Sequence, residues 1–385
     1  MKKIFFVIPT MGGGGAERVF LNILKNIDRK KFNPTLVLFE KKGEYLDLVP
    51  DDIHIFSLKG IDVKWKIFGT VFIRLAKKLS KLMVEERPDI ILSFMWYTNF
   101  IALVSRWISG IKVPIAISER YSLSKSNEGL IEEYIRRVII KYFYKYADLI
   151  IVNSEEMKSQ LNDMYNIPQR KILVIYNPVD IDSIMNLSKE NDGEAVNNEI
   201  PVIMGMGRVT PQKGFSYLIK AIYILDTYSI RCKLCILGDG QEKENLKKLT
   251  LELGIQDRVE FLGFKRNPYK YLSRSDIFVL SSLYEGFPNA LVEAMILGIP
   301  VISTRCPTGP EEIIVDGENG VLVNPGNEKE LADAIRDLLE DDQRRKKIAR
   351  EGMMRAHSFA IQRIVREYEG ALWKMLHVQN GWRNE

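Results

Sequence analysis

The stretch VIMGMGRVTPQKG, at residues 202–214, decides the fold of the C-terminal half. Its apolar first part has the pattern of a buried strand, and its second part is a loop with glycines and cations that leads into a segment of helical period. The stretch IFFVIPTMGGGG, at residues 4–15, follows the same order near the start of the chain. Each half is therefore predicted to begin with a strand, a loop and a helix.

Short apolar runs alternate with helical patterns along most of the chain, which predicts parallel sheets with helices on both faces. The predicted strands lie at residues 4–8, 35–39, 89–94, 113–118, 148–153, 171–176, 202–206, 233–237, 258–261, 277–280 and 301–303. A polar segment without apolar periodicity, 188–199, separates two sets of strands, and the chain after Gly326 has only helical patterns. We expect an α/β protein with two Rossmann-like domains that face a central cleft. The expected divisions are a first domain at 1–185, a linker at 186–199, a second domain at 200–360, and a C-terminal helix at 361–385 that can pack back on the first domain.

The composition is that of an ordinary globular protein, with 46% hydrophobic and 27% charged residues among 385. It excludes a disordered, collagenous or disulfide-stapled chain. A net charge of +5 is too small to indicate nucleic-acid binding. Three cysteines are too few for a disulfide framework, and Cys232 and Cys235 fall in a predicted strand, which favours packing over redox or metal chemistry. Without a convincing signal or spanning segment, we expect a cytoplasmic protein, soluble or peripherally attached to a membrane.

Two loops could bind an anion, because each precedes a helix whose first amides are free to donate. Gly12–Gly15 allows close approach of a ligand to the backbone, although a flexible turn explains it equally well. Arg208 and Lys213 place two cations on the second loop, which suits a diphosphate. In isolation, that spacing is also typical of solvated loop charges.

The segment YEGFPNALVEA, at 284–294, carries two carboxylates around a predicted helix start. Glu285 lies in the loop and Glu293 lies one turn into the helix, where Glu285 could hold sugar hydroxyls and Glu293 a ribose. Backbone amides from Gly286 to Leu291 would point into the cleft. Paired carboxylates also occur in glycosidases, but those enzymes do not need an anion-binding helix start. The remaining alternative is a pair of surface glutamates.

Taken together, these motifs resemble family 4 retaining glycosyltransferases, which have the GT-B fold. The resemblance covers nearly the whole chain and rests on Gly12–Gly15 with Ala16–Arg18, Arg208 and Lys213 with their flanking glycines, Leu237–Gly240, Phe261–Phe264, Glu285 with Glu293, and Gly298–Ile302. It implies transfer of a sugar from a nucleotide diphosphate sugar, expected to be UDP-linked, with no metal and no other cofactor. The C-terminal domain would bind the donor and the N-terminal domain the acceptor.

The resemblance also implies roles for single residues. Arg208 and Lys213 would bind the diphosphate, Glu285 the donor sugar, and Glu293 the ribose. The remaining residues of the implied donor site are Gly207, Phe264 beside the base, Gly286, Phe287, and the amides of Asn289, Ala290 and Leu291 at the distal phosphate. Gly14 and Gly15 would lie across the cleft, near the phosphate and the acceptor.

One position departs from the family pattern. Many relatives carry a histidine after the strand predicted at 113–118, and this chain has Glu119 and Arg120 there. We expect these two residues on the acceptor side, or as an ion pair that caps a helix. The loop from Cys306 to Ile313 resembles that of members that transfer hexoses or N-acetylhexosamines in bacterial surface-glycan assembly.

Two basic patches in the first domain bear on the acceptor. Residues 65–83 predict an amphipathic helix with an apolar face and a lysine-rich face, which could lie on an anionic membrane or simply cover the core. Arg136, Arg137, Lys141 and Lys145, with tyrosines among them, suggest a second patch. A lipid-linked glycan acceptor at the inner face of the plasma membrane is therefore expected. A nucleotide-sugar epimerase of GT-B shape and a non-catalytic sugar-nucleotide binding protein remain alternatives.

Overall fold

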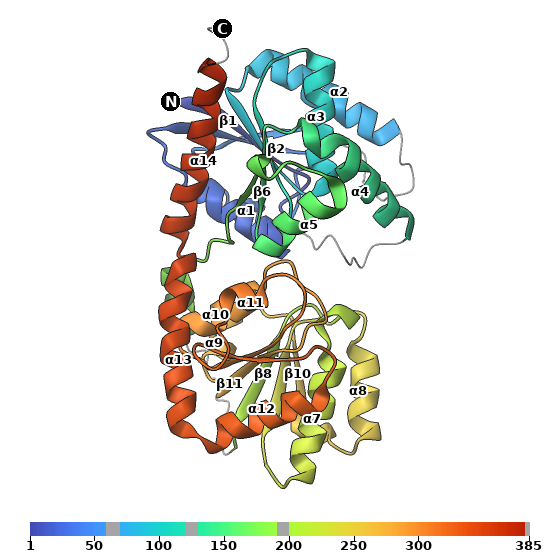
Figure 1. The fold of residues 1–385 in the computed structure, drawn as a ribbon, viewed down its shortest axis with the longest axis vertical. Coiled ribbons are helices and arrows are strands. Elements are labelled where there is room, and N and C mark those ends of the chain that lie inside the picture. The colour runs from blue at the N-terminus through green and yellow to red at the C-terminus, as the bar shows by residue number, and fades with distance from the viewer. Residues whose placement is uncertain (59–69, 121–129, 191–199, 382–385) are drawn as a thin grey trace. The chain divides into compact units, whose positions relative to one another are not determined.

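The computed structural model describes residues 1–58, 70–120, 130–190 and 200–381 (Figure 1). The chain forms two compact units, one of Met1–Pro178 with Ile361–Glu385 and one of Val179–Ala360. The first boundary falls before helix α6 (Ile181–Ser188), earlier than residue 185, because α6 packs against helices of the second unit. Residues 191–199 of the expected linker lie outside the described residues.

The first unit is built on a parallel sheet of seven strands in the order β3-β2-β1-β4-β5-β6-β7. Its strands are β1 (Lys2–Ile8), β2 (Phe32–Leu38), β3 (His54–Ser57), β4 (Ile90–Phe94), β5 (Ile115–Ser118), β6 (Leu149–Val152) and β7 (Ile172–Val174). Its helices are α1 (Gly15–Asn26), α2 (Thr70–Glu86), α3 (Trp96–Ser109), α4 (Leu130–Phe143), α5 (Glu155–Tyr165) and α14 (Ile361–Gly381). The inner strands β1, β4, β5 and β6 are largely buried on both faces, as parallel strands between helices must be.

Two apolar clusters cover the two faces of this sheet. One contains buried residues of α2, α3, α4 and α5, and the other joins α1 to α14. Helix α1 buries Val19, Phe20, Ile23 and Leu24, which lie at helical spacing on one face. The last helix, α14, contributes Ile364, Tyr368 and Leu372 to the same cluster, so it packs within the first unit (Figure 1).

The second unit contains a parallel sheet of six strands in the order β10-β9-β8-β11-β12-β13. Its strands are β8 (Val202–Met206), β9 (Lys233–Leu237), β10 (Val259–Gly263), β11 (Ile277–Leu280), β12 (Val301–Thr304) and β13 (Val321–Val323). Its other helices are α7 (Phe215–Thr227), α8 (Lys243–Glu252), α9 (Tyr269–Leu272), α10 (Asn289–Ile296), α11 (Pro310–Ile313), α12 (Glu328–Glu340) and α13 (Asp342–Ala356). The prediction of two Rossmann-like units with parallel sheets and a helical C-terminus is confirmed.

The structure has two strands that the sequence did not predict, β3 and β13. Both are edge strands and both are short. Strand β3 is half-exposed along most of its length, so its residues do not form the continuous apolar run by which a central parallel strand is recognised. All the strands that the sequence predicts are present, with ends that differ by a few residues.

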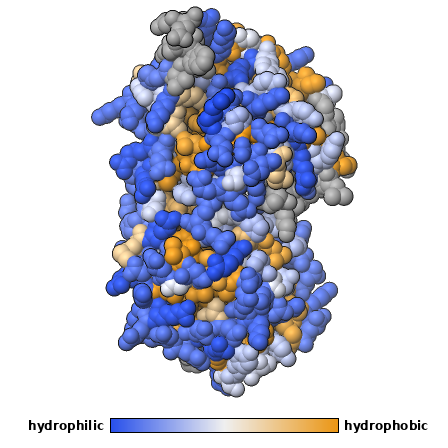
Figure 2. Space-filling model, in the orientation of Figure 1, coloured by the Kyte–Doolittle hydropathy of each residue, from blue (hydrophilic) through white to orange (hydrophobic). Residues whose placement is uncertain are grey.

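The surface visible in Figure 2 is largely hydrophilic, because the apolar residues of both units are concentrated in their cores. Cys232, Cys235 and Cys306 are buried and free. Burial raises the pKa of the Cys232 and Cys235 thiols to about 11, so these thiols are protonated and pack as small apolar groups. In the described parts of the chain, no helix is both long and apolar enough to cross a membrane.

Candidate functional site

The loop after β8 is folded tightly against the end of β11. Gly214 has a φ of +61°, and a Cβ at that position would lie 2.1 Å from the carbonyl oxygen of Ser281. Only glycine meets both demands. The Ser281 hydroxyl in turn donates to the carbonyl oxygen of Lys213 at 2.9 Å. Because β8 and β11 are neighbours in the sheet, this loop and the segment after β11 lie together at the carboxyl ends of the strands, where open α/β sheets bind ligands.

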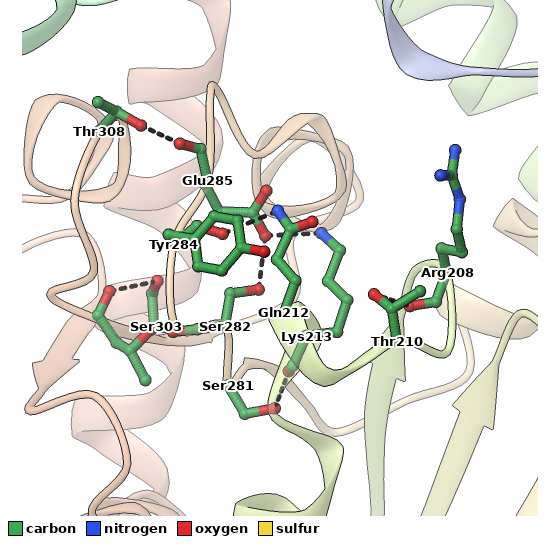
Figure 3. Close-up of polar contacts among 11 residues, drawn as sticks. Arg208, Thr210, Gln212, Lys213, Ser281, Ser282, Tyr284, Glu285, Ser303 and Thr308 are labelled. Atoms are coloured by element: carbon green, nitrogen blue, oxygen red, sulfur yellow. Dashed lines mark hydrogen bonds and ion pairs between the residues drawn. The ribbon is translucent and has the colours of Figure 1, made fainter. Parts of the chain in front are cut away.

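Lys213 and Glu285 form a buried ion pair at this edge (Figure 3). Lys213 Nζ lies 2.6 Å from Glu285 Oε1, and the two side chains are only 16% and 7% exposed. The Ser282 hydroxyl donates to the same carboxylate oxygen at 2.5 Å. The positive and negative charges cancel, so each is stabilised although little water reaches them. The structure therefore brings together two of the three residues that the resemblance places at the diphosphate and the donor sugar, namely Lys213 and Glu285.

The backbone around Glu285 is held from two sides. The Glu285 amide donates to the Pro307 carbonyl at 3.1 Å, and the Thr308 hydroxyl donates to the Glu285 carbonyl. On the other side, the Gln212 side-chain amide donates to the Tyr284 carbonyl at 2.9 Å. Sequence reasoning did not single out the supporting side chains of Gln212, Ser282 and Thr308. The sequence offered one signal for them, because each lies within or next to a segment already singled out: Gln212 beside Lys213, Ser282 near Glu285, and Thr308 in the Cys306–Ile313 loop.

Arg208 does not join this pair. It lies on the same loop but is exposed, and Figure 3 shows its side chain directed away from Lys213 and Glu285. Within the described part of the chain, its guanidinium forms no hydrogen bond or ion pair. The expected pair of cations is therefore not preassembled. Lys213 is occupied by Glu285, while Arg208 is free to contact a ligand from solvent.

Helix α10 begins directly after the loop that carries Glu285. The amide of Asn289 donates to the Phe287 carbonyl and that of Leu291 to the Pro288 carbonyl, each at 3.0 Å. These two amides, expected at the distal phosphate, thus already have backbone acceptors, whereas the Ala290 amide donates to no group in the described residues. On the core side of the helix, Glu293 is 4% exposed.

Two aromatic residues border this region. The Tyr269 hydroxyl donates to Glu293 Oε1 at 3.4 Å, so α9 helps to hold the carboxylate expected at the ribose. Phe264 directly follows β10 and is 63% exposed, which leaves its ring accessible for stacking. In contrast, Phe287 is buried and its ring packs at 5.4 Å from that of Phe359. Phe287 is therefore placed to support the loop.

In the first unit, the glycine loop is lined by carboxylates. Gly14 caps α1, which starts at Gly15. A Cβ at Gly14 would lie 2.4 Å from a carboxylate oxygen of Glu17, and one at Gly13 would lie 2.5 Å from a carboxylate oxygen of Glu44. The missing side chains make room for these acidic groups. Their negative charge opposes the anion-binding tendency of the helix start and favours hydroxyl donors as ligands.

Glu119 and Arg120 follow β5 and are buried, at 0% and 7% exposure. The Tyr144 hydroxyl donates to Glu119 Oε2 at 2.6 Å. Arg120 donates from Nη1 to Asn177 Oδ1 at 2.6 Å and from Nε to the Ser118 hydroxyl at 2.9 Å. Burial lowers the pKa of Arg120 to about 9 and, together with the Glu119 charge, raises that of Tyr144. These residues form a buried polar network at the carboxyl edge of the first sheet.

The structure agrees with the first predicted basic patch more closely than with the second. The helix expected at 65–83 is α2 from Thr70 onward, and its earlier residues lie outside the described ones. Leu75, Leu79 and Leu82 are buried in the core, and Lys77 and Lys81 are exposed, so both faces are as predicted.

The second patch was wrong in part. Arg136 and Tyr144 are 1% and 0% exposed. Arg136 lies on the face of α4 that packs on the sheet, and Tyr144 lies in the 3-10 turn Tyr144–Tyr146 that directly follows α4 and packs in the same core. Arg137, Lys141 and Lys145 do lie outside the core. In the described residues, no group of three or more histidine, cysteine or acidic side chains is placed to hold a metal ion.

Comparisons with known proteins identify the class of this chain. Residues 13–183 match the family described as Glycosyltransferase Family 4, and residues 188–354 match Glycosyl transferases group 1. The chain belongs to this family of glycosyltransferases. The resemblance that the sequence motifs carried is thus confirmed.

Two relatives span almost the whole chain. An uncharacterized glycosyltransferase of Methanocaldococcus jannaschii is 33% identical over 93% of this chain and 95% of its own length. The N-acetylgalactosamine-N,N'-diacetylbacillosaminyl-diphospho-undecaprenol 4-alpha-N-acetylgalactosaminyltransferase of Campylobacter jejuni is 31% identical over 95% of this chain and 98% of its own length. Among solved structures, the Anabaena protein HepE in complex with UDP-glucose is similar in fold, with a TM-score of 0.80 and 24% identity over 97% of this chain and all of that one.

Proposed function

We propose that this glycosyltransferase moves a hexose or N-acetylhexosamine, with retention of anomeric configuration, from a UDP-sugar to a lipid-linked glycan. The observation that carries the proposal is the ion pair of Lys213 and Glu285 at the carboxyl edge of the second sheet. A carboxylate can accept hydrogen bonds from sugar hydroxyls, and an ammonium can neutralise a phosphate. One pair therefore supplies a contact for each half of a nucleotide diphosphate sugar.

The neighbouring groups suit the remaining parts of such a donor. Arg208 is exposed and free to fold onto the diphosphate, and the Ala290 amide at the start of α10 can donate to the distal phosphate. Glu293, held by Tyr269, would accept from the ribose hydroxyls. Phe264 presents an exposed ring beside which a base could stack. Gly207, Gly286 and Asn289 would let the backbone approach the ligand.

The chemical step that these residues would assist is departure of the diphosphate. Negative charge grows on the leaving phosphate as the glycosidic bond opens, and Lys213, Arg208 and the helix amide would stabilise it. The acceptor hydroxyl would attack from the same face, and its proton would pass to the departing phosphate, which balances the charges. Because cationic side chains supply the stabilisation, we expect transfer without a divalent metal.

The acceptor is the part of the proposal for which the similar proteins give the most information. The Campylobacter jejuni relative is named for an acceptor built on diphospho-undecaprenol. The exposed lysines of α2 suit a protein that works at an anionic membrane surface, which here would be the inner face of the plasma membrane. Glu119 and the carboxylates near Gly14 and Gly15 would accept hydrogen bonds from acceptor hydroxyls. The reaction would serve polysaccharide or glycoconjugate synthesis.

The direct test incubates the protein with UDP-sugars and a diphosphate-linked glycan acceptor. We expect UDP release and a longer glycan product only when donor and acceptor are both present, at a rate that a chelator leaves unchanged. A new epimer of the sugar in the absence of acceptor would instead favour an epimerase. UDP-sugars that raise the melting temperature without any turnover would favour a non-catalytic binding protein.

A further inference from the structure

The loop that carries Glu285 rests on the loop directly before α11. The Glu285 amide donates to the Pro307 carbonyl at 3.1 Å, and the Thr308 hydroxyl donates to the Glu285 carbonyl (Figure 3). Gly309 has a φ of +98°, and a Cβ at that position would lie 2.7 Å from Pro288 Cδ. The backbone of one loop therefore supports the other from Glu285 as far as Pro288.

The end of α11 is in turn bonded to α13. Arg355 donates from Nη2 to the Glu312 carbonyl at 2.6 Å and from Nε to the Ile313 carbonyl at 3.3 Å. Carbonyls at the C-terminal end of a helix have no donor within the helix, and they attract a cation. Arg355 therefore holds α11, and with it the loop on which Glu285 rests.

Arg355 reaches the same loop by a second route, through an aromatic ring. Its guanidinium carbon lies 5.2 Å from the centre of the Phe359 ring, within the range of a cation–π contact. The Phe359 ring lies 5.4 Å from that of Phe287, which comes two residues after Glu285. The backbone of Phe359 is also fixed, because its carbonyl accepts from the Val179 amide at 2.9 Å. Both routes lie within the second unit.

The position of Glu285 matters most when the donor binds. In the structure, Lys213 and Ser282 hold its carboxylate directly. If the diphosphate takes Lys213, the carboxylate loses a charged partner. Its placement against the sugar then depends more on the backbone that carries it, which is the backbone that α11 and Phe287 support.

We propose that Arg355 is a positioning residue for sugar transfer, which acts on Glu285 through α11 and through Phe359. The inference rests on the proposed function, in which Glu285 contacts the donor sugar. A displacement of about 1 Å from a change far from the reacting atoms can lower a rate by about a hundredfold. Two supports that converge on one side chain give that side chain such an influence.

The first test compares Arg355→Met with the wild type. We expect kcat to fall about tenfold to a hundredfold. Calorimetry should find UDP bound with the same stoichiometry and an affinity within about twofold, because Lys213 and Arg208 lie on the loop after β8. Arg350→Met is the matched control, since Arg350 lies on the same helix, is 67% exposed and pairs with Glu351. It should behave as the wild type does.

A second test asks whether Arg355 acts through Glu285. In a Glu285→Gln background, Arg355→Met should lower kcat by less than about twofold, because the group that it positions has already lost its charge. A structural role would instead multiply the two losses. Full multiplication, or equal kcat in Arg355→Met and Arg350→Met, would overturn the proposal. So would a loss of rate that is matched by a loss of UDP-binding sites.

If Arg355→Met does not fold, Arg355→Lys is the variant to use, because it keeps the charge without the planar fork. Its kcat should fall about threefold to tenfold with UDP binding retained, and a kcat equal to that of the wild type would overturn the proposal.

Hydrogen exchange separates a failure of this inference from a failure of the proposed function. Without ligand, amides of residues 284–291 should exchange faster in the Arg355 variant than in Arg350→Met, because the supports of that loop are weakened. Equal exchange would overturn the positioning role. Faster exchange in a protein whose wild type binds UDP but transfers no sugar would keep Arg355 as the support of the Glu285 loop, and the proposed transfer would fail.

Discussion

The two units hold their charged groups in different ways. In the second unit, Lys213 and Glu285 neutralise each other, and Ser282 adds a hydrogen bond to the carboxylate. In the first unit, the charged residues Glu119 and Arg120 are bonded to neutral side chains, Glu119 to the Tyr144 hydroxyl and Arg120 to Asn177 and Ser118. The difference lies in what each charge is bonded to. A paired charge must exchange its partner for a charged ligand, whereas a charge bonded to neutral groups need not.

The largest expected effect comes from breaking the neutral pair at its cation. Lys213→Ala should lower transfer by about a hundredfold or more, since one lost donor to a developing charge costs about 3 kcal/mol. Rates of UDP release in the presence of acceptor measure this loss. The matched control is Lys220→Ala, a half-exposed lysine on α7 that pairs loosely with Glu328 at 3.8 Å. Equal activity in the two variants would remove Lys213 from the site.

Changing the anion of the pair should leave its cation free for the diphosphate. Glu285→Gln leaves Lys213 with surplus positive charge, so we expect UDP to bind as tightly as before or more tightly. Transfer should nevertheless fall roughly tenfold to a hundredfold, because a charge-assisted hydrogen bond to the sugar is worth about 1.5–3 kcal/mol. Calorimetry of UDP binding and initial rates separate the two effects.

The control for this variant is Glu328→Gln, which removes a half-exposed carboxylate from the same unit. Weaker UDP binding in Glu285→Gln than in Glu328→Gln would show that Glu285 does not compete with the diphosphate for Lys213. The inference that Lys213 exchanges Glu285 for the diphosphate would then be wrong.

The smallest expected effect lies at the surface of the first unit, where the lysines of α2 are exposed and Lys81 contacts Glu85 at 3.6 Å. Replacing Lys77 and Lys81 with glutamine should weaken binding to vesicles that contain anionic lipid, by about tenfold, since each basic group near such a surface contributes about 1 kcal/mol. Co-sedimentation at low and high salt measures this effect. Lys25→Gln with Lys30→Gln removes the same charge from other exposed positions and should change little. Unchanged binding of the α2 variant would favour an acceptor free in solution.

Much of the fold and part of the proposed donor site could be predicted from the sequence. Lys213 and Glu285 are 72 residues apart, and their meeting follows from two adjacent parallel strands whose carboxyl ends lie at one edge. Each strand was recognisable as an apolar run, and each loop as a motif. The supporting contacts of Ser282 and Thr308 were not predictable, because they depend on loop conformations that no periodicity encodes.

Arg136 shows where the sequence misleads. Its charge, beside Arg137, suggested a basic surface patch. The helical spacing of Ile139 and Ile140 placed it on the buried face instead, and the structure follows the spacing. The direction of Arg208 was likewise unpredictable, since nothing in the unliganded chain contacts its guanidinium within the described residues.

A crystal structure of the protein with UDP tests the central claim most directly. We predict the distal phosphate at about 3 Å from Lys213 Nζ, with Arg208 turned inward and the Lys213–Glu285 contact lengthened or shared. UDP bound elsewhere, or at this edge with Lys213 still closed on Glu285 and Arg208 directed into solvent, would contradict the account.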